Sequence, residues 1–122
     1  MVRLSVWERG SFRRVLQAFA HRTDPVQFLW RPEGLWVYSD VMNVSFEPPF
    51  FDYYVCDSPT SITITARSCR RLARVWDANQ VLTLELLPPG DCVRFVLEPH
   101  GGGPPHQEQL RAVGSSGPAG PQ

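Results

Sequence analysis

The apolar residues of this chain follow one pattern twice, and this repetition limits the possible folds more than any other feature. Each copy begins with a strand of alternating apolar and polar residues, continues into a helix and ends in further strands. In both helices the apolar residues recur at i, i+3, i+4 and i+7, the spacing of one helical face. These residues are Phe12, Val15, Leu16 and Phe19, then Cys69, Leu72, Ala73 and Trp76. Phe12 and Cys69 lie 57 residues apart, which sets the repeat length.

The first copy is bounded by clear turn and cap signals. Val2, Leu4 and Val6 alternate with polar neighbours, Ser11 is a candidate helix cap, and Asp24-Pro25 is expected to stop the helix. A turn at Pro32-Glu33-Gly34 predicts a hairpin. The expected strands are 26–31, 35–39 and the alternating run of Met42, Val44 and Phe46, which Glu47-Pro48-Pro49 breaks.

The second copy follows with Phe51, Tyr53 and Val55 in alternation and a turn at Ser58-Pro59. A strand over 61–65 and a helix over 66–76 come next. Strands at 81–87 and 92–98 form a hairpin around a Pro/Gly-rich turn. Three residues from each strand can face the helices: Leu82, Leu84 and Leu86 with Val93, Phe95 and Leu97.

These elements predict an α+β fold of the DNA-clamp type, two strand-helix-strand-strand-strand repeats that form a curved antiparallel sheet. We expect this sheet to be continuous and both helices to cover one of its faces. The single domain spans residues 1–98. Residues 99–122 are rich in Gly and Pro and predict a flexible tail, with a weak strand signal over 107–113.

Charge is strongly segregated along the chain, although the net charge is zero. All twelve basic residues are Arg, and seven of them lie within 11–22 and 66–76, where no acid occurs. A neutral chain with two acid-free basic helices favours an anionic partner, and phosphate backbones bind such surfaces without base readout. The alternative is a solvated helix face that is merely basic.

The residues expected on the outward helix faces form the candidate DNA-binding site. In the second helix Arg67, Arg70, Arg71 and Arg74 follow the same i, i+3, i+4, i+7 spacing, opposite the apolar stripe. In the first helix the outer positions are Arg13, Arg14, Gln17 and His21. The planar guanidinium of Arg can bind phosphate oxygens in pairs, which suits this role.

The order of several short motifs resembles the sliding-clamp family, in particular the first domain of proliferating cell nuclear antigen. The motifs are 51–57 (FDYYVCD), 61–65 (SITIT) before the Arg helix, and 34–40 (GLWVYSD) before 44–46. The resemblance covers residues 2–98. Checkpoint-clamp subunits and viral processivity factors share the fold.

The resemblance implies a ring around duplex DNA, with the Arg helices lining the channel and a polymerase or repair factor tethered to it. It also implies a nuclear location. Family chains carry at least two such domains, whereas this chain has one. Ring closure then needs six copies of this chain or a partner subunit, or it does not happen. The rival hypothesis is an interaction module that pairs edge to edge with clamp subunits and does not grip DNA. A third reading is an α+β protein whose likeness to clamps is coincidental.

The sequence predicts no enzyme, no cofactor, no metal site and no small-molecule substrate. Two of the three His fall in the expected tail, and Cys56, Cys69 and Cys92 lack ligand-pair spacing. An odd number of widely spaced cysteines indicates a reducing intracellular location and not a disulfide-stabilised fold. A membrane-spanning helix needs about 20 consecutive apolar residues, and the sequence contains no such run.

The aromatic residues allow two interpretations. Trp30, Trp36 and Tyr38 could stack single-stranded bases, although aromatics on strands are more often core or interface. The aromatics around 50–54 could form a protein contact, although strand packing is the more common role.

Overall fold

The computed structural model describes residues 1–7, 10–22, 25–77, 79–88 and 90–113 of the 122, and it has an α+β fold. Its first elements are β1 (Val2–Trp7), α1 (Ser11–Arg22), β2 (Val26–Arg31), β3 (Gly34–Tyr38), β4 (Asn43–Phe46) and η1 (Pro48–Phe50). The remaining elements are β5 (Tyr53–Cys56), β6 (Thr60–Ile64), α2 (Ala66–Val75), β7 (Gln80–Leu87), β8 (Cys92–Pro99) and β9 (His106–Arg111).

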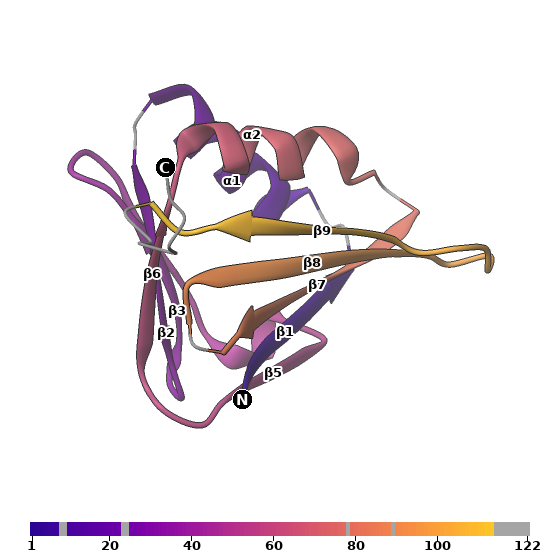
Figure 1. Cartoon of the computed structure of the whole chain (residues 1–122), viewed down its shortest axis with the longest axis horizontal. Helices are drawn as coiled ribbons and strands as arrows, with labels where there is room; N and C mark the ends of the chain where they lie inside the picture. Colours follow the sequence, from indigo (N-terminus) through magenta and orange to yellow (C-terminus); the bar gives the residue numbers. More distant parts are fainter. Residues whose placement is uncertain (8–9, 23–24, 78, 89, 114–122) are drawn as a thin grey trace.

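The strands form two antiparallel sheets, so the prediction of one continuous sheet is wrong. One sheet has the order β5-β1-β7-β8-β9 and the other β4-β3-β2-β6. Figure 1 shows the sheets at an angle to each other, with α1 and α2 on the same side of the molecule. Twist accumulates from strand to strand, and large twisted sheets therefore tend to split into two packed layers. The backbone N–H of Val113 donates to the carbonyl of Thr63 at 2.7 Å, linking the end of one sheet to β6 of the other.

The two repeats exchange the strands that directly precede their helices, β1 and β6. β1 comes from the first repeat but pairs with β7 of the second, with Leu4 opposite Leu84. β6 comes from the second repeat but pairs with β2 of the first, with Phe28 opposite Ile62. Each sheet therefore contains strands from both halves of the chain, and one core lies between them.

The core confirms the predicted apolar faces. Phe12, Phe19, Trp30, Trp76 and Phe95 are completely buried. The predicted hairpin is also confirmed, because its six apolar residues pair across the strands as Leu82–Leu97, Leu84–Phe95 and Leu86–Val93. In helix α2 the residues of the predicted apolar face, among them Cys69, Leu72 and Ala73, are buried against the core.

Residues 106–111 form β9 on the free edge of β8, so they are not a flexible tail, and the weaker expectation of a strand over 107–113 is met for residues 107–111. Leu110 pairs with Val93 and is buried, so the strand adds a residue to the core. The Gly-rich segment 101–103 connects β8 and β9 and masked the strand signal in the sequence. Residues 114–122 of the predicted tail, and Asp24 of the predicted helix stop, lie outside the described residues.

Two smaller predictions also need correction. Helix α1 begins at Ser11, since the carbonyl of Gly10 accepts the N–H of Arg14 at 2.9 Å, so Ser11 is the first helical residue instead of the cap. In β5 the inward face holds Tyr54 and Cys56, whereas Tyr53 is 46% exposed. Pairing with β1 fixes this pleat, because Tyr54 lies opposite the buried Leu4.

The β2–β3 turn requires a glycine. Gly34 has φ +148°, and a Cβ there would lie 2.4 Å from the carbonyl oxygen of Phe46. Close approach of two backbones excludes any side chain at this position. The hydroxyl of Tyr54 donates to the carbonyl oxygens of Arg31 and Gly34, both at 2.7 Å, and so ties the turn to β5.

Candidate nucleic-acid interface

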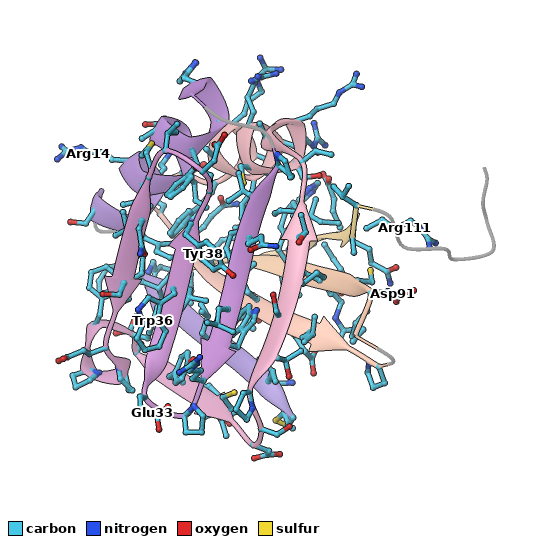
Figure 2. All side chains as sticks on the ribbon, turned by 90° about the vertical axis from the view of Figure 1, so that its left-hand side faces the viewer. Arg14, Glu33, Trp36, Tyr38, Asp91 and Arg111 are labelled. Atoms are coloured by element: carbon cyan, nitrogen blue, oxygen red, sulfur yellow. The ribbon has the colours of Figure 1, made fainter. Side chains whose placement is uncertain are left out.

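Helices α1 and α2 lie side by side and run in opposite directions, as two contacts between them show. The guanidinium of Arg13, near the start of α1, reaches the carbonyl of Ala73 near the end of α2. The guanidinium of Arg70 reaches the carbonyl of Ala20 near the end of α1. Figure 2 shows nitrogen-bearing side chains projecting from the helices on the side away from the sheets.

Neither helix has an acidic residue in its first turn. Acids usually occupy this position because the helix dipole favours negative charge there. In α2 a neutral side chain serves instead, since Thr65 accepts the N–H of Ser68 at 3.0 Å through its hydroxyl. The local sequence thus starts the helix without placing a carboxylate among the arginines.

The structure brings all eight predicted site residues to the two helices. Arg13 is half-buried, and the other seven are exposed: Arg14, Gln17, His21, Arg67, Arg70, Arg71 and Arg74. The contacts of the six arginines nevertheless divide these arginines into three groups with different roles.

Arg13 and Arg70 form the first group, because each donates to a backbone carbonyl of the opposite helix. The distance from Arg13 Nε to the Ala73 oxygen is 3.0 Å, and that from Arg70 to the Ala20 oxygen is 3.2 Å. The last carbonyls of a helix have no partner within it, and basic side chains commonly bind them. These two arginines therefore hold the helices together as well as carrying charge.

Arg71 forms the second group, because a carboxylate from β9 binds it. Its Nε lies 3.1 Å from both oxygens of Glu108, and its terminal nitrogen lies 2.5 Å from Oε2. Nε2 of His106 contacts the same carboxylate at 2.6 Å. These hydrogen bonds, led by the one from Arg71, lower the pKa of Glu108 despite its partial burial. The same contact raises the pKa of Arg71 above its ordinary value.

Arg14, Arg67 and Arg74 form the third group. Within the part of the chain that the structure describes, their side chains make no ion pair or side-chain hydrogen bond. A guanidinium in this state keeps all its donors for solvent or a ligand. This group is the part of the predicted site that is open to an external anion.

A shallow groove of about 190 Å³ runs between the helices. Its basic wall comes from Arg70 and Arg74 of α2, and its opposite wall from Gln17 and His21 of α1. Ala20 and Ala73 form the floor, where their small side chains let the helices approach closely. The groove offers a concave surface with donors on both sides and no carboxylate among its lining residues.

Sequence reasoning missed Glu108 and His106, because both fall in the segment expected to be a tail. The signal that could have found them is the repeat itself. The first copy has three strands after its helix, and a matching third strand in the second copy falls near residues 106–111.

The aromatic residues take different places. Trp30 is completely buried, which confirms the core interpretation. Trp36 and Tyr38 lie on the outer face of the four-stranded sheet, as Figure 2 shows, away from the helices. The guanidinium carbon of Arg31 lies 5.7 Å from the centre of a Trp36 ring. Phe51 is buried and stacks on Tyr54 with ring centres 5.4 Å apart, so packing is its role.

The residues that the structure describes include neither a metal-binding cluster nor a helix suited to a membrane. No group of three or more His, Cys, Asp or Glu side chains among them could hold a metal ion. No helix in the described ranges is both long and apolar enough to cross a bilayer.

The chain was also compared with known proteins. No protein-family model matches it, and a search of curated proteins finds no match.

Proposed function

We propose that this chain is a component of a DNA sliding clamp, or polymerase processivity factor, that binds duplex DNA without sequence preference in replication or repair. The observation that supports this proposal is the pair of adjacent helices whose outer faces carry Arg14, Arg67 and Arg74, none of which forms an ion pair with another residue that the structure describes. The resemblance to the clamp family supplies the expected context, including a nuclear location and polymerase or repair partners.

The binding would be electrostatic. Each guanidinium that neutralises a phosphate releases condensed counterions, and this release favours binding at low salt. Contacts to phosphates carry no sequence information, so the protein could move along the duplex. Arg67 and Arg74 lie about two turns apart on α2, which spreads their charge along the helix.

The test is the salt dependence of duplex binding in an Arg67→Ala/Arg74→Ala variant. Removal of two phosphate contacts should make the slope of log K against log salt shallower by about 1.8, since each contact contributes about 0.9. Fluorescence anisotropy of a labelled duplex of random sequence, over a series of salt concentrations, measures this slope.

The matched control is Arg31→Ala/Arg111→Ala, which removes the same charge from positions outside the helices. Arg31 lies beside Trp36 on one sheet, and Arg111 ends β9. We expect the control to keep the parent slope. Equal slopes in the two double variants would show that net charge, and not the helix face, governs binding, and the proposal would then be wrong.

A second candidate function is an interaction module that pairs with clamp subunits through sheet edges. The supporting observation is that the sheets end on the edge strands β5 and β9 in one and β4 in the other, whereas the remaining edge strand, β6, already accepts the N–H of Val113. Unpaired backbone N–H and C=O groups on such edges can accept a strand from another chain. Under this alternative, removal of Arg67 and Arg74 would leave partner binding intact.

A further inference from the structure

The carboxylate of Glu108 occupies the part of Arg71 that would bind a phosphate. Two oxygens of the carboxylate face Nε and a terminal nitrogen of the guanidinium, the paired geometry that arginine also uses with phosphate. A second anion cannot use the same donors at the same time. Arg71 is therefore the one arginine of the described α2 surface that already holds an internal anion.

The position of Glu108 in the fold explains how a residue of β9 reaches the helix. Glu108 lies opposite Phe95, whose side chain is completely buried, so both point to the inner side of the sheet, toward α2. β9 is the edge strand nearest to α2 in Figure 1. The contact thus connects the sheet edge to the basic helix face across 37 residues of sequence.

The ion pair is open to exchange. The side chain of Arg71 is 50% exposed and that of Glu108 is 23% exposed. Ion pairs at such exposed sites stabilise proteins only weakly, because solvent and salt screen them. A polyanion with many phosphates can therefore compete with the single carboxylate.

We propose that Glu108 is an internal competitor for phosphate, so that Arg71 joins the DNA-binding face only when Glu108 leaves it. This inference rests on the proposed function. On the basic face of α2, Arg67 and Arg74 can then bind phosphate directly. Arg71 can bind phosphate only after Glu108 of β9 has moved away from it.

The test is Glu108→Gln, which keeps the shape of the side chain and removes its charge. This variant should bind the labelled random-sequence duplex on the order of three to ten times more tightly at about 0.1 M salt, with a slope steeper by about 0.9. Arg71→Ala alone should change little, because Arg71 is already occupied. In the double variant Glu108→Gln/Arg71→Ala the gain should disappear.

The matched control is Asp77→Asn, which removes one negative charge just beyond the end of α2. Asp77 accepts the N–H of Asn79 and contacts no arginine in the hydrogen bonds described. We expect a smaller gain and an unchanged slope. A gain from Glu108→Gln that persists without Arg71, or that Asp77→Asn matches, would overturn the proposal and assign the effect to net charge.

A DNA-free measurement separates failure of this inference from failure of the proposed function. The Nε–H signal of Arg71 in nitrogen-15 NMR should shift on addition of inorganic phosphate in Glu108→Gln and stay unchanged in the parent protein. If duplex binding is absent but this difference is present, exchange at Arg71 stands and the DNA proposal fails. If the parent binds DNA through Arg67 and Arg74 but the signal does not differ, the inference fails alone.

Discussion

At the scale of single residues, Tyr54 combines a structural hydrogen bond with an unusual titration. Its hydroxyl donates to two carbonyls of the β2–β3 turn, and burial, more than the nearby negative groups, raises its pKa to about 12. The phenolate cannot donate these bonds. The protonated form is therefore tied to the folded state.

This shift predicts a loss of stability at alkaline pH. The pKa in the unfolded chain is about 10 and the folded value is higher, so the contribution of Tyr54 is complete below pH 10 and lost as pH rises toward 12. Urea unfolding between pH 8 and 12 should show a decline that is smaller in Tyr54→Phe. The chain has no Lys, so no lysine titration overlaps this range. Burial also raises the pKa values of Cys56 and Cys92, so these thiols could cause a similar decline. An equal decline in the parent protein and in Tyr54→Phe would therefore show that Tyr54 is not its cause.

The sequence predicted which arginines point outward, but not what they contact. Helical spacing fixes direction relative to the apolar stripe, and the exposed state of Arg14, Arg67 and Arg74 follows from it. The partner of Arg71 comes from a strand 37 residues away, and that of Arg70 is a backbone carbonyl 50 residues away. Spacing within one helix carries no information about either contact.

At the scale of elements, the reciprocal contacts between α1 and α2 predict different roles for equally basic positions. Arg13→Ala and Arg70→Ala each remove a hydrogen bond to a helix-end carbonyl and should lower the free energy of unfolding by about 1 kcal/mol. Arg67→Ala, in the same face, should change it by less than about 0.5 kcal/mol. Urea denaturation at pH 7 measures all three. Equal losses at the three positions would show that the interhelix bonds contribute nothing specific.

Strand prediction succeeded where alternation was strong and failed where turn residues dominated. The paired leucines of 82–86 and their partners in β8 identify a hairpin from sequence alone. β9 contains one apolar residue, Leu110, among five polar ones, so hydrophobic alternation gives almost no signal. The division into two sheets depends on twist and on strand exchange between the repeats, which no local pattern encodes.

At the scale of the whole molecule, the open sheet edges make the oligomeric state a direct test of the two candidate functions. If the chain builds its own ring, light scattering over a concentration series should approach the mass of about six chains, the closed assembly that the clamp resemblance implies. A constant mass of one or two chains would contradict self-assembly. Ring closure would then require a different clamp subunit at the edges of β4 or β9.

The strand exchange between the repeats also has a kinetic consequence. β1 ends at Trp7, but its central partner β7 begins only at Gln80, so the middle of the five-stranded sheet cannot form until most of the chain is available. Pairing between such distant segments costs the entropy of closing a long loop before the strand contacts contribute any stabilisation, and this cost slows folding. During synthesis the first repeat would leave the ribosome with β1 unpaired and β2 lacking β6. An apolar strand exposed during that period can aggregate or bind a chaperone. This exposure ends only when the second half of the chain has been synthesised and β7 pairs with β1.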